Sequence, residues 1–137
     1  MFYCEILSGL WIGDVSISLN NKFIQDNSID IILNCSSTFG FTELPLQKIR
    51  LPFSDSFEAD TDIKLLRDNK KKICNFIKTN ILKKNILICC YDGKTISPLL
   101  YALYLKEYSK IDAKSIYPLL LEKEKSLRLW LDLSLFD

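Results

Sequence analysis

Short apolar runs alternate along the chain with longer segments in which apolar residues recur every three or four positions. The runs are too short for helices and rich in β-branched residues, which is typical of buried strands. They predict strands at residues 5–7, 10–12, 29–35, 47–52 and 85–90. Polar segments at 36–43 and 54–62 are predicted to be loops.

The segments with helical periodicity predict a set of helices between these strands. They lie at residues 14–27 (a turn and short helix), 62–82, 95–108, 112–121 and 127–136. In the first of them, Leu19, Phe23 and Ile24 are expected to share one face. The helix at 95–108 is apolar nearly all round and should be central, with Pro98 in its first turn, where the missing N–H costs nothing.

Strands that alternate with helices predict an α/β fold, with a central, mainly parallel, twisted sheet flanked by helices on both faces. The chain has 137 residues, of which 48% are apolar, so it is long enough for one hydrophobic core. It contains no repeat, linker or low-complexity segment. Residues 1–137 are therefore predicted to form a single domain.

The charge and the apolar pattern narrow the classes of partner. A formal charge of +1 argues against a nucleic-acid surface built on bulk electrostatics. The chain has no apolar stretch long enough to cross a membrane, and its first residues lack the basic region of a signal peptide. We therefore expect a soluble, intracellular protein that binds neither nucleic acid nor membranes.

The cysteines and the amino-acid composition indicate the cellular compartment and the kind of genome that encodes the protein. Five cysteines at irregular spacing, without a CxxC pair and without any histidine, argue against a zinc site and for free thiols in the reducing cytoplasm. We expect no metal and no cofactor. Lysine supplies 15 of the 18 basic residues, and with abundant Ile and Asn this favours an AT-rich genome, such as that of some large DNA viruses or protists. A viral protein would reside in the host cytoplasm or the virion.

One strand-loop-helix junction carries the chemistry. The strand at 85–90 ends in Cys90, a tight loop with Gly93 follows, and a helix starts near Thr95. In such a junction the loop N–H groups and the positive helix end converge on one point, which suits an anion and lowers the pKa of a thiol placed there. A cysteine at this point is a ready nucleophile.

Residues 89–98 read Cys-Cys-Tyr-Asp-Gly-Lys-Thr-Ile-Ser-Pro, which resembles the HCxxGxxRSP signature of the cysteine-based dual-specificity phosphatases. The resemblance implies that Cys90 is the nucleophile, Gly93 the loop glycine and Ser97 the hydroxyl that assists the leaving thiolate. Asp55, in a loop after a strand, is similar to the family's general acid. The implied phosphate loop consists of Cys90, Tyr91, Asp92, Gly93, Lys94, Thr95 and Ile96. The flanking elements follow the family's order, whereas the last twenty residues match poorly.

Two departures from the signature weaken the implied activity. Ile96 stands at the position of the arginine that grips the phosphate with two hydrogen bonds, and Cys89 replaces the histidine before the nucleophile. Two charge-assisted hydrogen bonds are worth roughly 3–6 kcal/mol. At about 1.4 kcal/mol per decade, their loss costs on the order of 10²–10⁴ in rate. The sequence therefore predicts a pseudophosphatase.

Several alternatives stay open at the level of sequence. Lys94 could replace the arginine, although it lies two residues early and lacks the planar fork. Cys90 is either a retained reactive thiol or a small buried apolar residue, and Asp55 is either a working acid or a loop cap. The Gly93-Lys94-Thr95 triplet is similar to part of a nucleotide-binding P-loop, but Ile88 stands where that motif needs glycine, which excludes it.

These readings give three hypotheses about function. The first is an inactive phosphatase fold that acts through a protein partner, either a phosphoprotein or the target of an active phosphatase. The second is a weakly active protein tyrosine/serine/threonine phosphatase that uses Cys90 and Asp55. The third is a module that binds phosphorylated partners without cleaving them, which Ile96 disfavours as strongly as the second. The sequence does not fix an oligomeric state.

Overall fold

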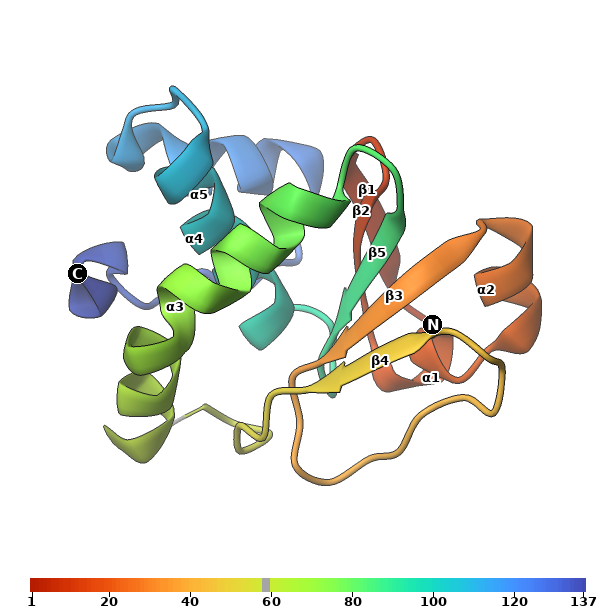
Figure 1. The fold of residues 1–137 in the computed structure, drawn as a ribbon. Helices are drawn as coiled ribbons and strands as arrows, with labels where there is room; N and C mark the ends of the chain where they lie inside the picture. The colour runs from red at the N-terminus through yellow and green to blue at the C-terminus, as the bar shows by residue number, and fades with distance from the viewer. Residues whose placement is uncertain (58–59) are drawn as a thin grey trace.

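One five-stranded sheet forms the centre of the structure, in the order β1-β2-β5-β3-β4 (Figure 1). The strands are β1 (Tyr3–Leu7), β2 (Leu10–Gly13), β3 (Ile29–Asn34), β4 (Gln47–Arg50) and β5 (Asn85–Cys89). Strand β1 runs antiparallel to β2, and the pairs β2–β5, β5–β3 and β3–β4 are parallel. This computed structural model describes residues 1–57 and 60–137. The predicted α/β fold with a mainly parallel sheet is confirmed.

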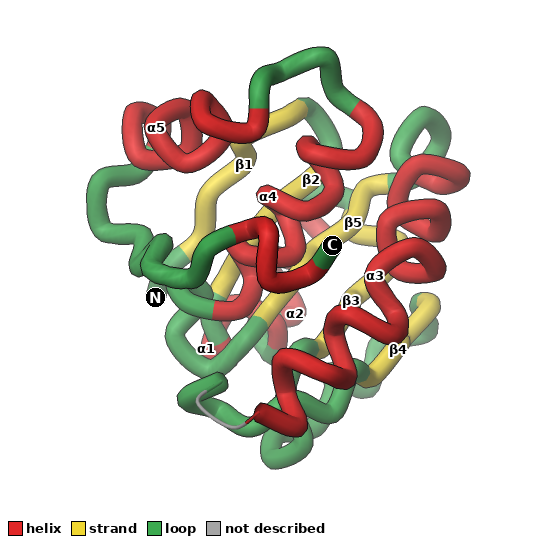
Figure 2. The backbone as a smooth tube through the Cα atoms, turned by 90° about the vertical axis from the view of Figure 1, so that its left-hand side faces the viewer, coloured by secondary structure: helices red, strands yellow, loops and turns green. Residues whose placement is uncertain are grey.

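Helices cover both faces of the sheet, as predicted. They are α1 (Val15–Ser18), α2 (Asn21–Asp26), α3 (Asp60–Asn80), α4 (Ile96–Tyr108), α5 (Ala113–Lys123) and a 3₁₀ helix, η1 (Leu133–Phe136). Helices α1 and α2 lie on one side, and α3, α4 and α5 on the other (Figure 1). Seen from that second side, α4 lies between α3 and α5 and contacts both (Figure 2).

The two faces of β5 feed two apolar cores because successive side chains of a strand point to opposite faces. Ile86 and Ile88 join the large core under α3, α4 and α5. Leu87 and Cys89 join the smaller core under α1 and α2. Both faces are therefore buried, which explains why the strand reads as an uninterrupted apolar run.

Helix α4 is central, as its apolar pattern predicted, and it contacts both β2 and β5. Tyr101 lies in the middle of α4 with its ring fully buried. Its hydroxyl accepts a hydrogen bond from the Leu7 N–H (2.6 Å) and donates one to the Leu10 carbonyl (3.2 Å). The β1–β2 pairing is irregular between Glu5 and Leu7, and Tyr101 supplies the partner that Leu7 lacks there.

The predicted helix at residues 127–136 is wrong, because only η1 is helical in that segment. Two tertiary hydrogen bonds hold the preceding part in a non-helical path. The Arg128 N–H donates to the Lys94 carbonyl (2.8 Å), and the Tyr117 hydroxyl donates to the Leu131 carbonyl (2.5 Å). The apolar side chains that suggested one continuous helix are still buried, but they reach the core from an irregular segment and from η1. They include Leu127, Leu131, Leu133 and Phe136.

Other boundaries also differ from prediction, such as that of the strand predicted at 47–52, which ends at Arg50. The segment at 14–27 splits into α1 and α2 because the Asn20 side chain caps α2 by accepting the Phe23 N–H. Leu19 ends α1 and is 45% exposed, so the expectation that it shares a buried face with Phe23 and Ile24 is wrong. Helix α3 already includes Asp60, and residues 58 and 59 of the predicted loop at 54–62 lie outside the described residues.

Candidate functional site

The candidate site lies at the edge of the sheet where the parallel strands end. Cys90 follows β5, the central strand, while Asp14 follows β2 and Ser36 follows β3. The loop with Asp55 follows β4. In open α/β sheets, ligands bind at this carboxyl edge, because loops from several strands meet there. The fold therefore brings the sequence-predicted residues to one edge.

The Cys90 loop folds back on the sulfur of Cys90. The side chain of Cys90 is 1% exposed, and its N–H donates to the Gly13 carbonyl (3.2 Å). At the start of α4, the Ser97 N–H donates to the Cys90 Sγ across 3.5 Å. Cys90 and Ser97 are thus held together, with the positive end of a 13-residue helix directed at the sulfur.

Gly93 makes this close loop sterically possible. Its φ is +72°, in the left-handed region that favours glycine. A Cβ at this position would lie 2.6 Å from the carbonyl carbon of Gly13 and 2.7 Å from the nitrogen of Asp14. The loop therefore packs directly against the β2–α1 connection, and the Val15 N–H donates to the Tyr91 carbonyl there (3.3 Å). The close packing and the positive φ therefore explain why glycine stands at position 93.

Ile96, at the arginine position of the signature, faces the protein interior. Its side chain is 0% exposed and belongs to the large core. Cys89, at the histidine position, lies on the opposite face of the sheet in the small core. Burial raises the pKa of the Cys89 thiol to about 12. Both replacements therefore put apolar, uncharged groups where the signature has polar ones.

Lys94 does not replace the missing guanidinium in this structure. Its ammonium lies over the ring of Phe2, 5.0 Å from the ring centroid, in a cation–π contact. Its backbone carbonyl and N–H are engaged by Arg128 and by the Asp92 carboxylate, respectively. The structure thus directs the Lys94 side chain away from Cys90.

Asp55 is exposed and is held by the loop after β3. The Ser36 hydroxyl donates to its Oδ1 (3.0 Å), and the Thr38 hydroxyl lies 3.0 Å from Oδ1 and 3.2 Å from Oδ2. Sequence reasoning missed both hydroxyls, because the segment at 36–43 carried no signal beyond its polarity. The hydrogen bonds described for Asp55 come from this loop and not from the Cys90 loop.

One hydroxyl next to Cys90 lacks a partner within the described part of the chain. Ser97 is fully buried, and its Oγ makes no hydrogen bond there, although its own N–H reaches the sulfur. Buried hydroxyls are rarely left in this state. The carboxyl edge of the sheet therefore retains unused hydrogen-bonding capacity.

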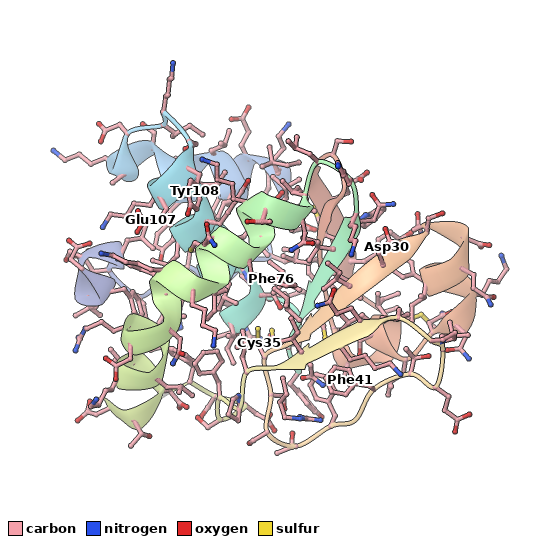
Figure 3. All side chains as sticks on the ribbon, viewed as in Figure 1. Asp30, Cys35, Phe41, Phe76, Glu107 and Tyr108 are labelled. Carbon is pink, nitrogen blue, oxygen red and sulfur yellow. The ribbon has the colours of Figure 1, made fainter. Side chains whose placement is uncertain are left out.

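The remaining cysteines are free thiols. Cys35, at the end of β3, lies inside the structure between α3 and the sheet (Figure 3). Burial, followed by the neighbouring thiols of Cys90 and Cys89, raises the pKa of Cys35. Across residues 1–57 and 60–137, no group of three or more His, Cys, Asp or Glu side chains is placed to hold a metal ion. Nor does any helix there have the length and apolar character needed to cross a bilayer.

Known proteins resemble this chain in backbone structure. No family model and no curated protein matches its sequence. Human DUSP28 is similar with a TM-score of 0.82 and 12% identity, over 98% of this chain and 89% of that chain. A mouse putative dual specificity phosphatase, in complex with zinc tungstate, gives a TM-score of 0.82 and 14% identity, over 98% and 83% of the two chains.

A third similar structure is the human tyrosine phosphatase-like serine/threonine/tyrosine-interacting protein. It gives a TM-score of 0.74 and 15% identity, over 98% of this chain and 92% of that chain. Structural similarity at such low sequence identity establishes a shared fold. The chain has the fold of the dual-specificity phosphatases, as the signature-like loop predicted.

Proposed function

We propose that this protein is a catalytically inactive member of the dual-specificity phosphatase fold that acts by binding a protein partner. The observation that carries the proposal is the burial of Ile96. Its side chain is 0% exposed in the core, so the start of α4 directs no guanidinium at the Cys90 loop. The two hydrogen bonds that such a group would give a transferring phosphoryl group are worth roughly 3–6 kcal/mol.

The environment of the other signature positions supports the same proposal. Cys89 lies in the small core, on the far face of the sheet from Cys90, so it cannot order the loop through a polar network as a histidine would. The fold itself is intact around this altered chemistry, since Gly93 and Ser97 keep the loop closed on Cys90. One structural neighbour is itself named a phosphatase-like interacting protein.

The test is hydrolysis of an aryl phosphate by wild-type protein and by Cys90→Ser. We expect both to release product at the same low rate, on the order of 10²–10⁴ below an active small phosphatase assayed in parallel. A wild-type rate within tenfold of the active enzyme, abolished in Cys90→Ser, would overturn the proposal. Capture of binding proteins with the two variants then tests the partner role, because a scaffold should retain its partner after Cys90→Ser.

A weakly active phosphatase is the second candidate. The contact between the Ser97 N–H and the Cys90 sulfur supports it, because a hydrogen bond stabilises a thiolate. In that reading Cys90 would attack phosphorus and Asp55 would protonate the leaving oxygen. The activity would then fall in both Cys90→Ser and Asp55→Asn, whereas background hydrolysis would respond to neither.

A further inference from the structure

The carboxylate of Asp92, two residues beyond Cys90, is partly buried and turns into the loop. Its Oδ1 accepts the Lys94 N–H (2.9 Å) and lies 3.6 Å from the Cys90 sulfur, which donates to it. Its Oδ2 accepts the Thr95 hydroxyl (3.0 Å). Both oxygens are therefore bound by groups of the same seven-residue loop.

These contacts are those that an oxyanion in this loop would make. A bound phosphate would have an oxygen close to the cysteine sulfur and would accept hydrogen bonds from loop N–H groups and from hydroxyls at the helix start. Asp92 supplies an oxygen that meets both conditions. It also supplies a negative charge, which the positive N-terminal end of α4 stabilises.

A guanidinium reaches the same carboxylate from a distant part of the chain. Nη1 of Arg128 lies 3.5 Å from Oδ2 of Asp92. The Arg128 N–H donates to the Lys94 carbonyl (2.8 Å), which fixes the backbone of Arg128 against the loop. Among the ion pairs of residues 1–57 and 60–137, this is the only one that involves a residue of the Cys90 loop.

We propose that the Asp92 carboxylate occupies the anion position of the Cys90 loop, and that Arg128 is the guanidinium that faces this position in place of the residue that Ile96 replaces. This inference rests on the proposed function and deepens it, because it gives a second reason why the Cys90 loop does not bind phosphate. Removal of Asp92 frees the Lys94 N–H, the Thr95 hydroxyl and Arg128 for an incoming anion. The partnerless hydroxyl of Ser97 adds a donor at the same helix start.

The experiment measures binding of inorganic phosphate by titration calorimetry to full-length protein. The variants are Asp92→Ala and Asp92→Asn. Asp112→Ala and Asp112→Asn are the matched controls, because Asp112 also accepts the N–H two residues on, from Lys114, but at the exposed start of α5. We expect Asp92→Ala to bind phosphate at least about tenfold more tightly than wild type, which is about 1.4 kcal/mol. Asp92→Asn should gain less, and the Asp112 variants should match wild type.

A second set of variants tests Arg128. In the Asp92→Ala background, Arg128→Gln should reverse most of the gain, whereas Lys125→Gln, which removes an exposed charge three residues earlier, should leave it intact. The amide resonance of Lys94 should shift on titration of Asp92→Ala and not of wild type, which locates the bound ion at the loop.

Three results would overturn the proposal. They are a folded Asp92→Ala that binds phosphate no better than wild type, an equal gain in Asp112→Ala, and a gain that Arg128→Gln does not reduce. If Asp92→Ala does not fold, Asp92→Asn decides, and an affinity equal to that of Asp112→Asn is the contradicting outcome. The readout is independent of turnover, so failure of the binding experiment leaves the proposed inactivity of the wild type untouched, whereas phosphatase activity in the wild type would refute the proposed function.

Discussion

The backbone N–H of Ser97 points at the sulfur of Cys90 across 3.5 Å, with both residues almost completely buried. This contact joins the end of β5 to the start of α4 and closes the loop between them. Closure of the loop depends on backbone groups and on Gly93, whereas phosphatase chemistry would depend on the side chains at positions such as 89 and 96. The shape of the loop and its catalytic capacity are thus separable, and each can be tested alone.

Gly93→Ala should destabilise the protein by more than about 2 kcal/mol, because the added Cβ would lie 2.6 Å from backbone and φ is +72°. The change should also separate Ser97 from Cys90 and expose the thiol to alkylation. Gly40→Ala is the control, because a Cβ there has nothing within 4 Å. Urea denaturation of both variants gives the comparison. Equal stability of the two would show that the loop can relax around the methyl group.

Ile96→Arg should cost more than about 3 kcal/mol of stability, because it places a charge at a position that is 0% exposed in the core. A version combined with Cys89→His tests whether the two signature residues can be introduced together. We expect a folded double variant to gain little phosphate affinity until Asp92→Ala is added. Thermal melting of Ile96→Arg against Ile96→Met, which keeps an apolar side chain, measures the cost of the charge. A melting temperature unchanged from wild type would show that position 96 can face the loop.

Tyr101→Phe should destabilise the protein by about 1–3 kcal/mol, because it removes the hydrogen-bond partner of the buried Leu10 carbonyl and of the partly exposed Leu7 N–H. Tyr108→Phe, at a residue that is 38% exposed, should change little. Amide hydrogen exchange at Leu7 should accelerate in the first variant only. Unchanged protection of Leu7 would mean that the backbone finds another acceptor.

Asp14 gives the structure a pH dependence at the acidic end. Burial alone would raise its pKa, but hydrogen bonds from Ser16, Ile17 and Phe2 outweigh this and lower the pKa below 3.8. A lowered folded-state pKa stabilises the protein above the unfolded-state pKa, and this stabilisation is lost as the pH falls through the folded value. Asp14→Asn should therefore be less stable than wild type at pH 7, by less than about 1 kcal/mol because solvent screens the partly exposed carboxylate, and nearly equal to it at a pH below the folded-state pKa of Asp14.

The comparison for this pH effect is Asp26→Asn, which breaks only an exposed pair with Lys22. It should change stability by less than about 0.5 kcal/mol at either pH. Denaturant titrations at the two pH values give the change in unfolding free energy for each of the two variants. A difference for Asp14→Asn that persists unchanged at low pH would assign its effect to packing and not to charge.

The fold could be predicted because the inner strands β3 and β5 are buried on both faces and therefore read as apolar runs. The Cys90 loop could be predicted because Gly93, Ser97 and Pro98 stand at fixed spacing. Residues that act through tertiary contact could not. Arg128 lies in a segment whose apolar spacing imitates a helix, but hydrogen bonds to distant residues, including the one to the Lys94 carbonyl 34 residues earlier, hold it in another path. Likewise, no local pattern places Ser36 and Thr38 on Asp55.

The strand order has a consequence for how the chain folds as it is synthesised. Strands β2 and β3 pair only through β5, which lies between them but is made after α3. Until residues 85–89 emerge, the β1–β2 and β3–β4 pairs each carry an open parallel edge, and open edges invite pairing with other chains. Such late, non-local closure slows folding. The same insertion that completes the sheet delivers Cys90 to its place, so a nascent chain that stops before β5 would be prone to aggregation and would lack the loop altogether.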